Sequence, residues 1–154
     1  MKKNFTQPFN RSTYFTARLL VETEPDKFIQ FLDQDELGTM YASTLSLKID
    51  ETGDIAIQLA KFLYENSLVL NGFRQIACET SVSFSFADDT PGVEADEVCF
   101  HVRADQTGEP LNEEEYGEAV YVSLDQMLTN FRESPSGISS VGKIGIIQLM
   151  NERR

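Results

Sequence analysis

Residues 74–87, RQIACETSVSFSFA, and residues 98–104, VCFHVRA, carry the most regular pattern in this 154-residue chain. In the first stretch, apolar side chains alternate with polar ones such as Glu79 and Ser81, and the second stretch alternates in the same way. An alternation with a period of two is typical of strands that bury one face. We therefore predict an antiparallel hairpin that leaves its other face in solvent.

The rest of the chain divides into further short elements on the same reasoning. Alternation predicts strands over residues 14–21, 39–49, 119–122 and 143–150. Helical spacing predicts helices over residues 25–38, 54–66 and 123–131, and the second of these is the clearest because Asp54 can cap its N-terminus. This order favours an α+β fold, a mostly antiparallel sheet of about five to six strands with three short helices on one side.

The length suits one domain, because most domains contain about 100–150 residues. We expect a flexible basic arm over residues 1–12, a single domain over residues 13–150 and a short tail over residues 151–154. The basic start is not followed by an apolar run of the kind found in signal peptides, and no stretch reaches the about 18 apolar residues of a membrane helix. Two cysteines give no disulfide framework. A cytoplasmic location is expected.

Motifs for catalysis are weak. Residues 137–143 have the Gly-x-x-x-x-Gly-Lys spacing of a phosphate-binding loop, but Ile144 replaces the Ser or Thr that such a loop requires, and a strand is expected to follow. His101 is the only histidine, and we expect it on the polar face of its strand beside Cys99, both at the surface. Cys78 is expected in the core. With no zinc cluster and no calcium-loop spacing, we predict no metal, no cofactor and no enzymatic activity.

Charge is the unusual property of this sequence. The formal net charge is −12, which disfavours direct binding to nucleic acid phosphates. Residues 79–118 hold twelve acids and one base and so carry −11, whereas residues 1–21 carry +4. Rows of carboxylates can dock on a basic surface and can imitate a nucleic acid backbone.

We therefore predict a small acidic protein-binding module, an inhibitor, immunity-type or anti-defence protein, whose partner is a basic protein surface, for example that of a nucleic-acid-binding protein. The residues expected to bind the partner lie in the acidic segment: Asp88, Asp89, Glu94, Asp96, Glu97, Glu113, Glu114, Glu115, Tyr116 and Glu118. Two alternatives stay open. One is an assembly protein that forms homo-oligomers through strand edges and its basic arm, and the other is an enzyme or ligand-binding domain that uses His101 or residues 137–143.

Overall fold

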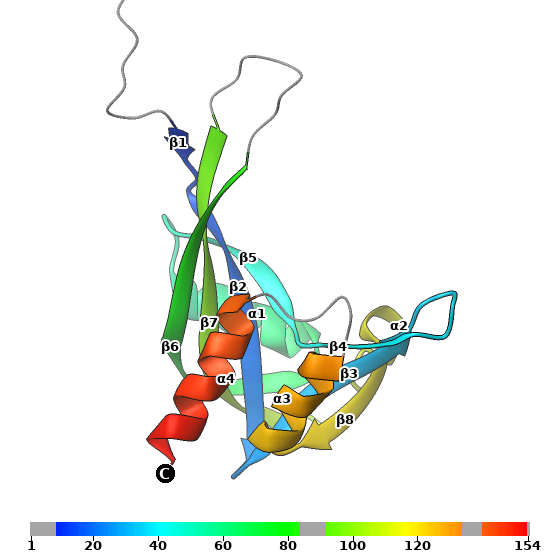
Figure 1. The fold of residues 1–154 in the computed structure, drawn as a ribbon. Helices are drawn as coiled ribbons and strands as arrows, with labels where there is room; N and C mark the ends of the chain where they lie inside the picture. Colours follow the sequence, from blue (N-terminus) through cyan, green and yellow to red (C-terminus); the bar gives the residue numbers. More distant parts are fainter. Residues whose placement is uncertain (1–8, 84–91, 134–139, 154) are drawn as a thin grey trace, which may run out of the picture.

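The computed structural model describes residues 9–83, 92–133 and 140–153 of the chain. Within these residues, eight strands and four helices follow one another (Figure 1). The strands are β1 (Phe9–Arg11), β2 (Tyr14–Glu24), β3 (Lys27–Gln34), β4 (Met40–Ser43), β5 (Ser46–Asp50), β6 (Leu68–Ser83), β7 (Gly92–Gln106) and β8 (Glu118–Val122). The helices are α1 (Ile55–Glu65), α2 (Glu113–Tyr116), α3 (Leu124–Glu133) and α4 (Ser140–Glu152). None of these four helices combines the length and the apolar composition that a membrane span requires.

All eight strands join one mixed sheet, in which β1, β7, β2, β3 and β4 are neighbours in that order. β7 runs parallel to both β1 and β2, and the remaining pairings are antiparallel. β6 pairs with β7, β5 with β2, and β8 with β3. The prediction of a mostly antiparallel sheet of five to six strands with three helices is therefore wrong.

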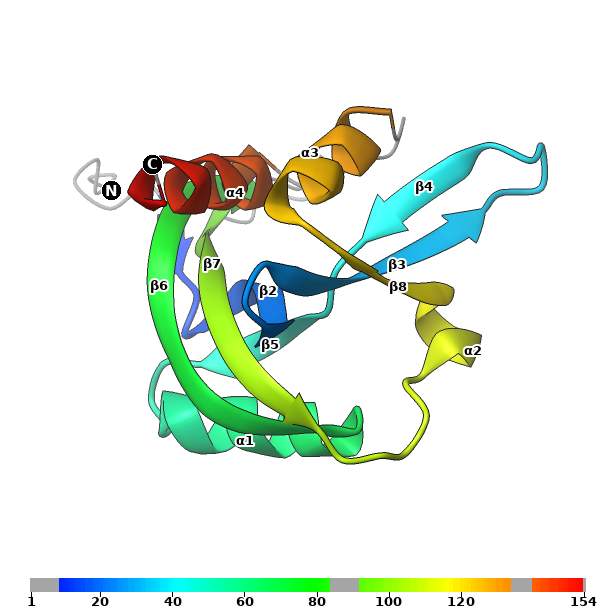
Figure 2. The same ribbon diagram turned by 90° about the horizontal axis from the view of Figure 1, so that it is seen from below.

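Helices cover both faces of this sheet (Figure 2). On one face α1 packs against a core that includes Phe15, Leu59 and Phe100. On the other face α3 and α4 pack against a second core that includes Leu20, Cys99 and Phe131. The expectation that all helices lie on one side is wrong, and the face of the β6–β7 hairpin that was expected to be wet is partly covered by α4.

Several elements were predicted correctly. The hairpin of β6 and β7 is confirmed, as are α1 and α3. Asp54 caps α1 as expected, since its side chain accepts a hydrogen bond from the Ile57 N–H at 3.0 Å. The single strand expected over residues 39–49 is divided into β4 and β5. Within the range expected to form an arm, Phe9–Arg11 form β1 beside β7; residues 1–8 lie outside the described part.

Two elements were assigned the wrong secondary structure. The helix expected over residues 25–38 is mainly β3, which buries every residue from Phe28 to Phe31 because both faces of the sheet are covered. A strand buried on both faces gives a continuous apolar run instead of alternation. The strand expected over residues 143–150 belongs to α4, whose buried residues follow a helical spacing: Val141, Gly142, Gly145, Ile146 and Leu149.

Gly145 allows α4 to approach the sheet closely. A Cβ atom at this position would lie 2.5 Å from the Cys99 Sγ and 3.1 Å from the Ile76 Cδ1. These distances are far shorter than ordinary van der Waals contacts, so α4 can lie this close to β6 and β7 only because position 145 has no side chain. The same approach buries Cys99, which was expected at the surface, while Cys78 is exposed and not in the core.

Candidate functional site

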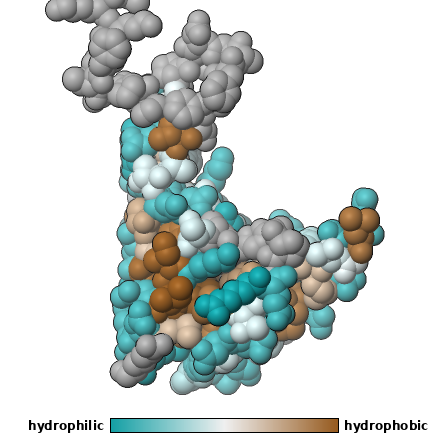
Figure 3. All heavy atoms as spheres, in the orientation of Figure 1, coloured by the Kyte–Doolittle hydropathy of each residue, from teal (hydrophilic) through white to brown (hydrophobic). Residues whose placement is uncertain are grey.

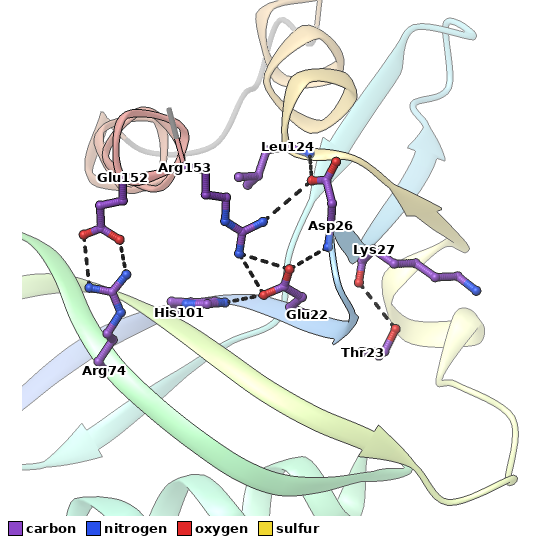
Figure 4. Close-up of polar contacts among 9 residues, drawn as sticks. All are labelled: Glu22, Thr23, Asp26, Lys27, Arg74, His101, Leu124, Glu152 and Arg153. Carbon is purple, nitrogen blue, oxygen red and sulfur yellow. Dashed lines mark hydrogen bonds and ion pairs between the residues drawn. The ribbon is translucent and has the colours of Figure 1, made fainter.

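A buried carboxylate near the end of the interior strand β2 lies next to the end of α4 (Figure 4). The Glu22 side chain is only 6% exposed and accepts hydrogen bonds from three directions. The His101 Nε2 lies 2.8 Å from its Oε1, the Arg153 Nη2 lies 2.9 and 3.0 Å from its two oxygens, and the Asp26 backbone N–H donates to Oε2 at 2.7 Å. We call Glu22, His101, Arg153 and Asp26 the Glu22 cluster.

The fold brings these four residues together from three separate segments. Parallel pairing of β2 with β7 aligns Leu20 with His101 and Glu22 with Arg103, so the Glu22 and His101 side chains share the α4 face of the sheet. Arg153 follows the last turn of α4 and reaches down over this face, with its guanidinium 5.4 Å from the centre of the Phe28 ring.

Asp26 lies in the turn between β2 and β3 and links the Glu22 cluster to α3. Its φ of +55° falls in the left-handed region, which Asp tolerates better than most residues. Its Oδ1 accepts a hydrogen bond from the Leu124 N–H at the start of α3 and lies 3.8 Å from the Arg153 Nη1. Both α3 and the end of α4 are therefore tied to the same turn.

The protonation states of Glu22 and His101 follow from their surroundings. Burial would raise the pKa of Glu22, but the hydrogen bonds from Arg153, the Asp26 N–H and His101 outweigh burial and hold this pKa below its ordinary value. Burial lowers the pKa of His101, although Glu22 opposes this change. A carboxylate can only accept, so the neutral imidazole carries its proton on Nε2 and keeps a lone pair on Nδ1.

Two cavities adjoin the Glu22 cluster and share Arg103 and Arg153 in their walls. One, of about 550 Å³, is lined on its acidic side by Glu22, Glu24 and Asp26. The other, of about 370 Å³, is lined by Arg74, His101, Arg103 and Arg153, with one carboxylate, Glu152. Three of the 13 Lys and Arg residues thus meet the only histidine at one cavity.

The cations of this second cavity differ in their partners. Arg74 forms a bidentate ion pair with Glu152, and Arg153 pairs with Glu22. The exposed guanidinium of Arg103 forms no ion pair with any described residue. Arg103 is therefore the group best able to bind an anion that enters beside His101.

The structure separates the acidic residues that were expected to bind a partner. Glu94, Asp96 and Glu97 lie near the start of β7, where each has a basic neighbour: Arg11 contacts the first two and Arg18 lies 4.0 Å from Glu97. Asp88 and Asp89 lie outside the described residues.

The remaining acidic residues follow β7, in α2 and at the start of β8. Two of the three glutamates of α2 stabilise the local fold: Glu113 accepts a hydrogen bond from the Ala119 N–H at 2.9 Å, and Glu115 accepts one from the Asn112 side chain at 2.9 Å. The Tyr116 ring packs on Phe31 with ring centres 5.3 Å apart, and burial raises its pKa. Glu118 is exposed at the start of β8. The basic partner expected for these residues stays a prediction.

Most of the Glu22 cluster was missed in the sequence. His101 was considered, but as a surface residue, because its strand alternates and α4 was assigned as a strand. Glu22 follows three buried apolar residues, Leu19, Leu20 and Val21. An acidic residue at such a position in an apolar strand is the one feature of the sequence that indicates a buried carboxylate. Arg153 lies in the range expected to be a tail, where nothing in the sequence indicates a partner 131 residues away.

The described residues do not form an obvious metal site. Carboxylate clusters are the usual way in which proteins hold Mg²⁺ or Ca²⁺. Among residues 9–83, 92–133 and 140–153, no group of three or more His, Cys, Asp or Glu side chains is arranged to bind a metal ion. Helix α1 contributes one carboxylate, Glu65.

Solved structures of other proteins share the fold of this chain. No protein-family model and no curated protein matches the sequence. Among solved structures, an ADP compounds hydrolase superposes with a TM-score of 0.62 and 10% identity, over 92% of this chain and 74% of the other. The MutT mutator protein of Bacillus halodurans gives 0.53 and 13%, over 76% and 72%. The E. coli ORF135 protein gives 0.63 and 10%, over 94% and 92%.

The chain therefore shares the fold of these three proteins. This finding overturns the hypothesis of a non-enzymatic acidic binding module, because the proteins that share its fold include an ADP compounds hydrolase. The prediction that the protein is not an enzyme is wrong for the same reason. At identities of 10–13%, the likeness concerns the fold, and the chemistry has to be argued from this chain's own residues.

Proposed function

We propose that this protein is a hydrolase that acts on a small phosphorylated compound at the cavity beside His101. The observation that carries the proposal is the meeting of Arg103, Arg74 and Arg153 with a buried Glu22–His101 pair, in a chain whose net charge is otherwise −12. An anion is repelled by most of an acidic surface, so a cavity rich in arginine is where a phosphate group would be held.

His101 would act as the general base. Its neutral imidazole has a free lone pair on Nδ1, and Glu22 fixes the ring through Nε2 at 2.8 Å. When Nδ1 takes a proton from water, the ionised Glu22 stabilises the imidazolium that forms. The water oxygen bonds to phosphorus, and the bond from phosphorus to the leaving oxygen breaks, with its electron pair leaving on the departing phosphate or phosphate ester.

Arg103 would bind the phosphoryl group, since it lines both cavities and its guanidinium has no carboxylate partner among the described residues. A guanidinium can make two parallel hydrogen bonds to phosphate oxygens and offset the charge that develops on them. Arg153 would contribute less to binding, because its charge is already offset by Glu22. A cytoplasmic location is part of this proposal, since Cys78 and Cys99 are free thiols.

The test is phosphorus NMR of the purified protein with inorganic pyrophosphate, ADP and an ADP-sugar. We expect hydrolysis of at least one compound, a loss of activity of about 10²- to 10⁴-fold in His101→Asn, and a raised KM in Arg103→Gln. Lys143→Gln is the matched control, because it removes a cation from α4 outside both cavities and should leave the kinetics unchanged. Turnover of none of the three compounds, or full activity in folded His101→Asn, contradicts the proposal.

A further inference from the structure

A third cavity lies on the opposite face of the sheet, beside the start of α1, and takes no part in the proposed hydrolysis. Its volume is about 580 Å³. Its wall is mainly apolar and is formed by Phe15, Phe73, Val98, Phe100 and Ile55. The first four come from β2, β6 and β7, and Ile55 is the first residue of α1. We call this cavity the aromatic pocket.

Three phenylalanine rings give the aromatic pocket its character. The Phe100 ring lies edge-on to Phe73, with centres 5.5 Å apart and planes at 76°, and edge-on to Phe15 at 6.3 Å and 72°. Phe15 and Phe100 are held in the α1 core, whereas Phe73 is only half-buried. Rings crossed in this way present their faces in different directions, and an aromatic face attracts cations.

The rim of the aromatic pocket is acidic. Arg11 makes a bidentate pair with Asp96 at 2.5 and 3.1 Å, and Glu51 and Glu94 lie 3.7 and 3.8 Å from the same guanidinium. Arg11, Glu51 and Asp96 line the pocket, so its rim holds two carboxylates and one cation, and Glu94 adds a third carboxylate beside the same guanidinium. Asp96 is ionised at neutral pH, because the hydrogen bonds from Arg11 and Thr80 hold its pKa below its ordinary value.

We infer that the aromatic pocket binds a small organic cation with an aromatic or alkyl body, such as an arylalkylamine. The apolar body would lie against Phe73 and Phe100, and the ammonium group would lie at the rim near Glu51. Anionic ligands are disfavoured by the same carboxylates. The exposed Gln75 side chain, also at this cavity, offers a further donor and acceptor.

The test compares two probes with the same ring and opposite charge, tryptamine and indole-3-acetate, titrated into the full-length protein and followed by amide NMR shifts and calorimetry. We expect tryptamine to bind about tenfold more tightly, because a cation is attracted by both the ring faces and the rim. The largest shifts are expected at the amides of Phe73, Val98 and Phe100. Binding of tryptamine no tighter than that of indole-3-acetate overturns the inference.

Variants place the probe at the aromatic pocket. Glu51→Gln, at an exposed rim position, should weaken tryptamine binding about two- to fivefold and leave binding of uncharged indole unchanged. Phe73→Ala should weaken both ligands. Arg103→Gln, in the opposite cavity, and Tyr64→Ala, an exposed aromatic residue of α1, should leave tryptamine binding unchanged. Equal loss of tryptamine and indole binding in Glu51→Gln contradicts the role of the rim charge.

Discussion

Gly145→Ala tests the contact that places α4 over the sheet. The added Cβ would lie 2.5 Å from the Cys99 Sγ, 3.2 Å from the Cys99 Cβ and 3.1 Å from the Ile76 Cδ1. Cys99 is fully buried, so its side chain has no space to move into and α4 must shift. Overpacking of a core costs about 1–3 kcal/mol, and the shortest distance here argues for the upper end. Alanine favours a helix over glycine by about 1 kcal/mol, so the free energy of unfolding should fall by about 2 kcal/mol in total.

Urea unfolding followed by circular dichroism measures this loss. Gly72→Ala is the matched control, because a Cβ at that position meets no atom within 4 Å, and its stability should change by less than about 0.5 kcal/mol. The double variant Gly145→Ala with Cys99→Ala relieves the shortest contact. Its loss in the free energy of unfolding should be smaller, by about 1–2 kcal/mol, than the sum of the losses in the two single variants. Strict additivity, or a Gly145→Ala protein as stable as the parent, refutes the close packing of α4.

Three further predictions concern the buried groups. Burial lowers the pKa of His101 in the folded protein, so neutral His101 contributes to stability above about pH 6.5, and this contribution is lost as the pH falls through the folded-state pKa. Thermal unfolding between pH 7 and 5 should show the loss, and the melting temperature of His101→Asn should depend less on pH. Glu22→Gln removes the charge that Arg153 pairs with and replaces one of the two acceptor oxygens by an NH2 donor, so it should lower the free energy of unfolding by about 3 kcal/mol. Glu118→Gln, at an exposed position, should not. Cys78 should react with iodoacetamide in the folded protein while Cys99 should not, because burial raises the pKa of Cys99 to about 12. Mass spectrometry of the labelled protein measures both reactions, and equal labelling of the two thiols would show that α4 does not protect Cys99.

The elements that could be predicted from the sequence are those whose pattern is local. In α1, Leu59 and Leu63 repeat at helical spacing behind the Asp54 cap, and in β7 apolar residues alternate with polar ones. The elements that were predicted wrongly have a pattern of apolar residues that depends on packing against segments far away in the sequence. In β3, Phe28 faces α3 and α4 while Ile29 faces the α1 core, so no polar face was left to indicate a strand.

The prediction for residues of α4 is wrong because their local composition is misleading. Residues 143–150 contain three isoleucines and one glycine, a composition that favours a strand over an isolated helix. Its helical conformation depends on packing, because Val141, Ile146 and Leu149 are buried against the sheet only when they share one helical face. With a strand expected over residues 143–150, the sequence shows no element that could cover His101, and this buried histidine is therefore expected at the surface.

Charge counted along the chain likewise differs from charge in space. Residues 79–118 carry −11, yet this segment also contains Arg103, the guanidinium that lacks a carboxylate partner among the described residues. Conversely, the acids at the start of β7 are partly neutralised by Arg11 and Arg18, from the segment that carries +4. The acidic strand β7 pairs with β1 and β2, which come from the basic segment, so acidic and basic residues that are far apart in the sequence lie side by side in the sheet. A protein with a net charge of −12 can therefore hold an anion-binding cavity on one face and an acidic pocket on the other, and the two proposed ligands of opposite charge follow from this separation across the sheet.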